Sequence, residues 1–305
     1  MTRDPKAILD VEPGTYDAIS HLKIQVISAI EGFLGGAHRS LHMGPSVEFS
    51  EHNRYSPGDD IRNIDWKALA RTDRFFVKAH ERDAQLTCLM LLDCSGSMNY
   101  QGSRARFTKF DFAKILLGAL SHLLVKQGDA VGVLGFADTL TNVLPPRSHP
   151  GHLPIVLDRL ARATVAHHAT TRFADVLKHA QARLGQRGML ILASDLWQLD
   201  EEAEIILKGL AHKGHDITIF QVQSPDEVDL PFDQTVEFRG LEQEGALVAD
   251  PALLRHAYVR AFREEQERIA LITRQAKVDL VTANVSRQPY EVLVEFATHR
   301  NRSRR

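Results

Sequence analysis

The chain lacks a cysteine framework: only Cys88 and Cys94 are cysteines among its 305 residues. They lie six residues apart on one predicted strand, a spacing at which they cannot close an ordinary disulfide. Two thiols are also too few for a four-ligand zinc site. We therefore expect two buried, free thiols and a reducing compartment.

Long apolar runs and an excess of charge are missing too. No stretch approaches the ~18 residues of a membrane span, and the first residues lack the apolar core of a signal peptide. Lys and Arg total 37 and Asp and Glu total 39, which gives a net charge of -2. That balance disfavours a protein whose main role is to coat nucleic acid or anionic lipid. We expect a cytoplasmic protein with no nucleic-acid partner and no membrane insertion.

Short apolar runs alternate with amphipathic segments over the second half of the chain. Buried strands are predicted at 86–93, 130–138, 188–195 and 216–224, with helical patterns between most of them. This alternation predicts a three-layer, doubly wound, mostly parallel α/β sheet of the Rossmann-like kind. Beyond it, the sequence predicts a β-hairpin insertion around Glu244-Gly245, a long charged helix over 251–277, a last strand and a closing helix.

The first part of the chain has a different texture. Apolar spacing predicts a helix over 16–34 that ends at Gly35-Gly36, and the polar stretch 40–82 predicts loops and short strands. We therefore divide the chain into residues 1–84, an N-terminal helix with a β-rich extension packed on the main domain, and residues 85–305, the α/β domain.

Oxygen-bearing side chains follow two of the predicted core strands. Asp93, Ser95 and Ser97 come after the first strand, and Asp195 ends the strand at 188–195. Thr171 precedes a predicted helix, where its hydroxyl either caps that helix or reaches a metal. Because ligands collect at the carboxyl ends of parallel strands, these segments are expected to meet in one crevice. Carboxylate and hydroxyl oxygens suit a hard cation such as Mg²⁺, and Mn²⁺ or Ca²⁺ use the same donors.

In this pattern the chain resembles the von Willebrand A fold and its metal-ion-dependent adhesion site. The matching residues are Asp93, Ser95, Ser97, Thr171 and Asp195, in the family's order. Two departures are mild: no glycines precede the threonine, so Thr170 competes with Thr171, and Leu196 stands where Gly is common. The resemblance implies a bound ion with one open coordination position for a carboxylate of a partner protein.

A second block narrows the resemblance to domain-of-unknown-function family 58. The segment SEHNRYSPGDDIRNIDWKALARTDRFFVKAHERD is similar to that family's hallmark region. Such proteins accompany MoxR-type AAA+ ATPases in bacteria. The resemblance thus implies an adaptor that works with such an ATPase, on a client protein that supplies an Asp or Glu, in the assembly, activation or remodelling of a complex.

Charges of both signs crowd this hallmark block. Its main members are Arg54, Asp59, Asp60, Arg62, Asp65, Trp66 and Arg71. They form either a partner-docking surface or an internal lattice of ion pairs anchored by Trp66, and the lattice is the interpretation we favour.

Two other functions compete with the non-enzymatic adaptor. One is a metal-dependent hydrolase or phosphotransferase that uses the same crevice, with Asp93 as the phosphorylated group and Lys109 and Asp195 beside it. No general base or substrate pocket is evident for it. The other is a structural remnant that binds no metal.

Overall fold

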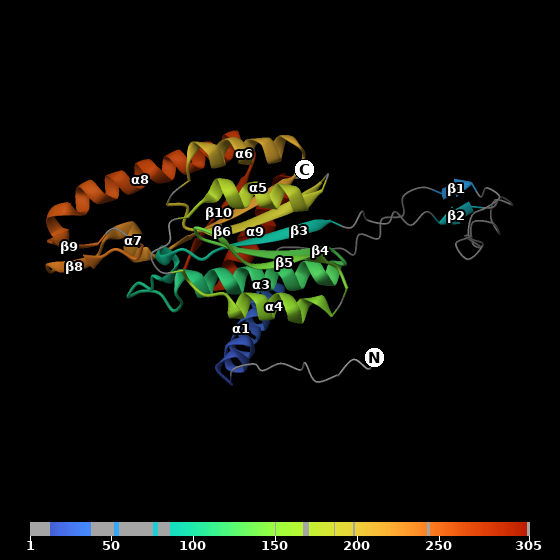
Figure 1. Cartoon of the computed structure of the whole chain (residues 1–305), viewed down its shortest axis with the longest axis horizontal. Coiled ribbons are helices and arrows are strands. Elements are labelled where there is room, and N and C mark those ends of the chain that lie inside the picture. The colour runs from blue at the N-terminus through green and yellow to red at the C-terminus, as the bar shows by residue number, and fades with distance from the viewer. Residues whose placement is uncertain are drawn as a thin grey trace, which may run out of the picture. The chain divides into compact units, whose positions relative to one another are not determined.

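A six-stranded sheet with the order β10-β7-β6-β3-β4-β5 forms the centre of the α/β domain in this computed structural model (Figure 1). The structure describes residues 13–37, 52–54, 76–78, 86–149, 151–166, 171–185, 187–197, 199–242 and 245–303. The strands are β3 (Thr87–Asp93), β4 (Ala130–Phe136), β5 (Leu140–Arg147), β6 (Gly188–Ser194), β7 (Asp216–Gln223) and β10 (Asp279–Asn284). All pair in parallel except the edge strand β5, which is antiparallel to β4.

Helices cover both faces of this sheet. One face carries α3 (Lys109–Gln127), α4 (His152–Arg162) and α9 (Pro289–Ser303), and the other carries α5 (Phe173–Leu184), α6 (Glu201–His212) and α8 (Pro251–Gln275). Both faces of the sheet need cover because successive side chains of a strand point to opposite faces and both sets are apolar. In β3, Cys88, Met90 and Leu92 pack under the first set of helices, and Leu89 and Leu91 pack under the second. The predicted three-layer, mostly parallel fold is confirmed.

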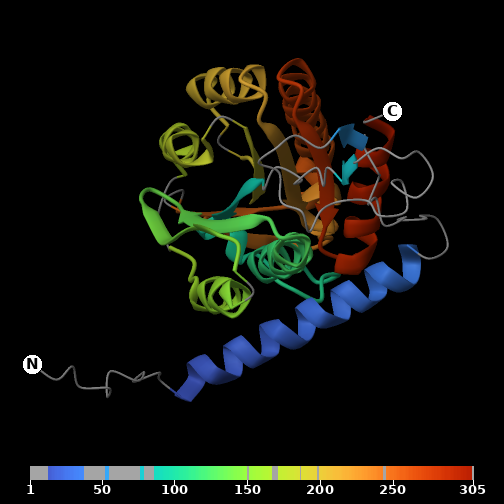
Figure 2. The same ribbon diagram turned by 90° about the vertical axis from the view of Figure 1, so that its right-hand side faces the viewer.

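Helix α1 (Pro13–Ala37) packs outside α3, α4 and α9 (Figure 2). Val26 lies so near Gly118 of α3 that an added Cβ there would come within 2.7 Å of a Val26 methyl carbon. The helix continues through Gly35 and Gly36, where we predicted its end, because a glycine costs a helix only about 1 kcal/mol and does not by itself stop it. Helix α1 and the α/β domain belong to one compact unit.

Residues Ser40–Gln85 form a unit of their own. Its described part consists of two short antiparallel strands, β1 (His52–Arg54) and β2 (Phe76–Lys78). Arg54 is in β1, while Asp59, Asp60, Arg62, Asp65, Trp66 and Arg71 lie outside the described residues. The ion-pair lattice therefore stays a prediction.

The remaining elements gather near the carboxyl ends of the strands. They are the 3-10 helix η2 (Gly96–Asn99), α7 (Pro225–Asp229) and the hairpin of β8 (Val236–Arg239) and β9 (Ala246–Ala249), which was predicted. Both cysteines are buried and free, as expected. Among the described residues, no helix has the length and apolar character needed to cross a membrane.

Candidate metal centre

The candidate site lies where the order of the strands reverses. From β3 the chain proceeds outward to β4 and β5 on one side, and then to β6, β7 and β10 on the other. Loops that leave β3 and β6 therefore diverge and open a crevice between them. Asp93 is the last residue of β3, and Asp195 directly follows the last residue of β6. The predicted carboxylates thus occupy the position where doubly wound sheets bind ligands.

The loop after β3 folds around its own acid. Ser95 donates its backbone N–H to Oδ1 of Asp93 at 2.9 Å, and the hydroxyls of Ser95 and Ser97 lie 3.1 Å apart. Both Asp93 and Ser95 are fully buried. Gly96 is required at this turn because an added Cβ would come within 2.0 Å of the Leu241 carbonyl oxygen. The hairpin loop therefore crosses directly over the candidate metal loop.

The two predicted carboxylates, Asp93 and Asp195, interact electrostatically. Burial and, second, the negative charge of Asp195 raise the pKa of Asp93 to about 7, although its hydrogen bonds oppose the shift. One of these bonds comes from the Ser194 hydroxyl, which lies 2.5 Å from Oδ2 of Asp93. Two buried acids at close quarters create a need for positive charge.

A lysine supplies part of that charge. Lys109 is fully buried, and its ammonium nitrogen lies 2.9 Å from Oδ2 of Asp195 and 2.5 Å from Oε1 of Glu227. Burial lowers the pKa of Lys109, but the charges of Asp195 and Glu227 outweigh it and the pKa is raised. Two carboxylates, Asp195 and Glu227, thus share this ammonium, and the third acid, Asp93, lies close enough to Asp195 for its pKa to be raised by that charge.

Sequence reasoning assigned Lys109 only to the competing phosphotransferase and missed Glu227. Local signals for both exist. Thr108 caps α3 and places Lys109 at its first position, and Ser224 and Glu227 form a capping box at the start of α7. The caps fix the backbone of each helix end, but nothing in the sequence shows that the two ends meet.

Thr171 stands at the same edge of the sheet. The next residue, Arg172, donates its backbone N–H to the Ala137 carbonyl just after β4. Five residues before Thr171, Ala166 donates its backbone N–H to the Cys94 carbonyl just after β3. The cap position of α5 belongs to Arg172, so helix capping is not the role of Thr171. Its side chain is half-buried, and Thr170 lies outside the described residues.

These groups fit a hard divalent cation. Within the described part of the chain, no three His, Cys, Asp or Glu side chains are clustered so as to hold a metal ion, which leaves the carboxylate-plus-hydroxyl set as the candidate. Oxygen-only donors of this kind suit Mg²⁺. A divalent cation would also favour the ionised form of Asp93, whose pKa is raised by burial and by the charge of Asp195.

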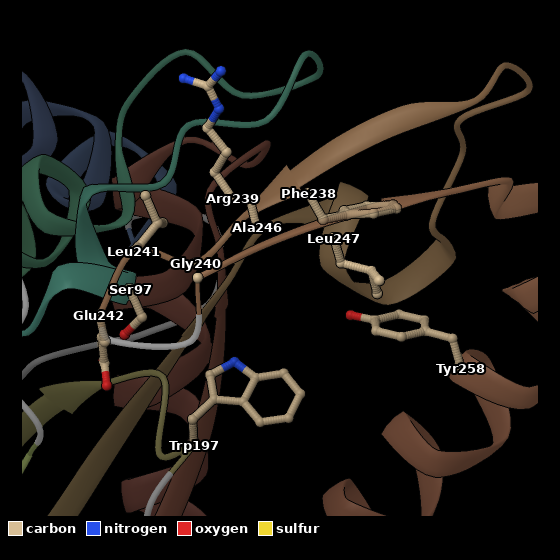
Figure 3. Close-up of a pocket in the computed structure, with 11 residues that line it drawn as sticks. Ser97, Trp197, Phe238, Arg239, Gly240, Leu241, Glu242, Ala246, Leu247 and Tyr258 are labelled. Atoms are coloured by element: carbon tan, nitrogen blue, oxygen red, sulfur yellow. The ribbon is translucent and has the colours of Figure 1, made fainter.

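One further acid reaches the crevice from the hairpin loop. Glu242 is 6% exposed, and its Cγ would lie 3.3 Å from a Cβ placed on Gly96. Figure 3 shows its side chain near that of Ser97. The loop of the hairpin thus brings a backbone carbonyl and a carboxylate to the candidate metal loop. The sequence did not predict this contact, because the two loops are far apart in the chain.

A family model and curated relatives match the chain. A family model described as "Protein of unknown function DUF58" matches residues 51–268. Uncharacterized protein Rv1480 of Mycobacterium tuberculosis is 27% identical over 304 residues, covering 95% of this chain and 91% of that protein.

Solved structures similar to the chain include a BatB protein and a VWA domain. The conserved hypothetical protein BatB of Bacteroides thetaiotaomicron is 19% identical, with a TM-score of 0.47, and the match covers 70% of this chain and 98% of BatB. The SpRpn10 VWA domain is 15% identical, with a TM-score of 0.41, over 68% of this chain and 94% of that domain. Because both scores are below 0.5, the fold assignment relies on the chain's own strand order.

Proposed function

The chain belongs to the DUF58 family, and we propose that it is a non-enzymatic, metal-dependent protein-binding adaptor. The observation that carries this proposal is the buried Asp93 at the strand reversal, whose pKa is raised to about 7 by burial and by the charge of the neighbouring Asp195. Lys109 pairs with Asp195 and Glu227, so ionising Asp93 adds a buried negative charge that is costly without a further cation.

Asp93, Ser95, Ser97, Thr171 and Asp195 would hold the ion, some of them through water. When bound, Mg²⁺ supplies a positive charge with an unfilled coordination position. Neutral hydroxyl donors leave part of that charge uncompensated, so a carboxylate of a client protein binds there and an amide in its place does not. Lys109 holds Asp195 in place between β6 and α3.

The resemblance of the hallmark block supplies the proposed context. We infer that a MoxR-type AAA+ ATPase is the partner, and that the client is a complex assembled, activated or remodelled by the pair. The chain contains no Gly-x-x-x-x-Gly-Lys-[Ser/Thr] segment, so it supplies no P-loop ATPase of its own.

Calorimetric titration with Mg²⁺ and Mn²⁺ tests the site. We expect a one-site isotherm for the wild type, loss of binding in Asp93→Ala, and wild-type binding in Asp138→Ala. Asp138 is the matched control, because it is an exposed acid two residues beyond β4 at the same edge of the sheet. Identical flat titrations of the wild type and Asp93→Ala would contradict the proposal and favour the structural remnant.

An assay of generic phosphate and carboxylic esters with Mg²⁺ tests the enzymatic alternative. The contact between Lys109 and Asp195 is the feature that a phosphotransferase would use. We expect no turnover above that of Asp93→Ala. Turnover that disappears in Asp93→Ala would show that the crevice is catalytic.

A further inference from the structure

A groove opens beside the candidate metal centre, between the hairpin β8–β9, α7 and α8. It has two adjacent parts of about 630 and 740 Å³, and both are lined by Ser97, Phe238, Arg239, Leu241, Leu247 and Tyr258. In Figure 3, Trp197 and Tyr258 lie on the side of the groove opposite the hairpin, and Ser97 and Glu242 lie at one end. Because Ser97 is also a candidate ligand, the groove and the metal centre are continuous.

The walls of the groove carry strongly exposed apolar side chains, and the charged Arg239 and Glu237 on its hairpin side pair with each other at 2.8 Å. Trp197 is 44% exposed, Leu247 62% and Leu254 44%. Large apolar patches of this kind mark binding surfaces in soluble proteins. The aromatic wall is also supported from behind: the buried ring of Phe262 lies 6.0 Å from that of Trp197 and 6.2 Å from that of Tyr258. Rings held in this way lose little freedom when a ligand binds.

The charged groups along α7 already have partners inside the chain. Asp226 accepts hydrogen bonds from Arg104 at 2.9 Å and from the Ser103 N–H at 2.6 Å. Glu227 pairs with Lys109, and its carbonyl accepts from the Tyr258 hydroxyl at 2.7 Å. The surface that this wall offers to a ligand is therefore apolar.

We propose that this groove binds large apolar side chains that flank the client's carboxylate. The client segment is then an extended stretch in which an Asp or Glu is followed within about two to four residues by Leu, Phe or a similar residue, since each extended residue advances about 3.3 Å. This inference rests on the proposed function, because the ion fixes the acid at Ser97 and thereby sets which neighbours reach the groove.

Trp197 provides a direct reporter of occupancy. The chain has two tryptophans, Trp66 and Trp197, so the full-length Trp66→Phe variant leaves Trp197 as the only one. The probe is the peptide acetyl-Gly-Gly-Asp-Leu-Phe-Gly-amide, which contains no tryptophan. We expect a saturable blue shift of Trp197 emission with Mg²⁺ present, and at least tenfold weaker binding when Leu and Phe of the peptide are both replaced by Gly.

Two neighbouring residues of β9 make a matched pair of variants. Leu247 and Val248 are exposed to similar extents, 62% and 67%, but only Leu247 lines the groove. Leu247→Ser is expected to weaken peptide binding about tenfold, in line with the loss of one buried apolar side chain. Val248→Ser should bind as the parent does. Equal affinities of the two variants, or no response of Trp197 to any peptide, would overturn the groove proposal.

The same titrations separate failure of the groove from failure of the metal site. Replacing Asp of the peptide by Asn, or adding chelator, tests only the ion. If neither weakens binding but Leu247→Ser does, the groove proposal stands and the metal-dependent function fails. If binding needs the Asp and Mg²⁺ but is insensitive to Leu247→Ser, the metal-dependent function stands and the groove proposal fails. Sedimentation that shows a dimer dissociated by Leu247→Ser would assign the groove to a second copy of the chain and overturn the proposal.

Discussion

Acidic side chains at the two edges of the mostly parallel sheet have different environments. At the amino edge, Asp216 at the start of β7 pairs with Arg300 of α9, and Asp129 before β4 accepts a hydrogen bond from the Leu86 N–H. At the carboxyl edge, Asp195 and Glu227 share the buried Lys109, and the pKa of Asp93 is raised by burial and by the charge of Asp195.

Exposure differs as much as pairing does. The side chain of Asp216 is 38% exposed, whereas those of Lys109 and Asp195 are 0% and 5% exposed. Water therefore screens the amino-edge pair, but at the other edge each charge must be offset by a neighbouring group. At the amino edge Asp216 is balanced by its own arginine, whereas the buried Asp93 at the carboxyl edge would gain from the cation that we propose.

The largest effect is expected from Lys109→Met. This change leaves the buried Asp195 without its cation, which typically costs about 3–5 kcal/mol of unfolding free energy, and it also unpairs the partly exposed Glu227. Urea denaturation with chelator present measures the loss.

Lys114→Met on the same helix is the control. The ammonium of Lys114 pairs with Asp111 at 2.8 Å, but the Asp111 side chain is 47% exposed. We expect a loss of about 1 kcal/mol or less for this variant. Similar losses in the two variants would mean that the carboxyl edge is no more dependent on positive charge than an ordinary surface.

A pH series sharpens the comparison further. Because folding raises the pKa of Asp93 from the ordinary 3.8 to about 7, the folded state binds more protons than the unfolded state between these values. The free energy of unfolding of the metal-free protein should therefore fall as pH rises from about 4 to about 7.

Asp93→Asn should remove this part of the slope. The comparison uses urea unfolding of both proteins in chelator at several pH values in this window, so that other titrating groups cancel. With saturating Mg²⁺, the wild type should recover stability at pH 7, because the ionised carboxylate binds the cation. Parallel pH profiles of the wild type and Asp93→Asn without metal would contradict the assignment.

The elements that local sequence determines were predictable. Each core strand is recognisable in the sequence as an apolar run. In β3 and β6 an acid of the candidate site stands at the end of that run, so Asp93 and Asp195 could be placed at one edge of the sheet. The hairpin and the long helix α8 were equally evident from their turn and apolar patterns.

What escaped prediction depends on contacts between distant segments. Lys109 is separated from Glu227 by 118 positions, and only the docking of α7 beside the start of α3 makes them partners. Likewise, Gly96 reads as a turn residue, but the passing Leu241 carbonyl is what excludes any side chain there. The groove is formed partly in the same way, because Ser97 and Trp197 join a lining that comes mostly from residues 226–258.

The smallest effect should come from the amino edge, with Arg300→Gln. The Arg300 guanidinium pairs with the partly exposed Asp216 and lies 5.5 Å from the centre of the Phe296 ring. Its loss should cost roughly 1 kcal/mol of unfolding free energy, because the acid left behind stays in contact with water. Thermal unfolding with and without Mg²⁺ should then show the same metal-induced stabilisation in Arg300→Gln as in the wild type. If Arg300→Gln reduced that stabilisation as Asp93→Ala is expected to, the two edges would be energetically coupled, and the amino edge would no longer count as purely structural.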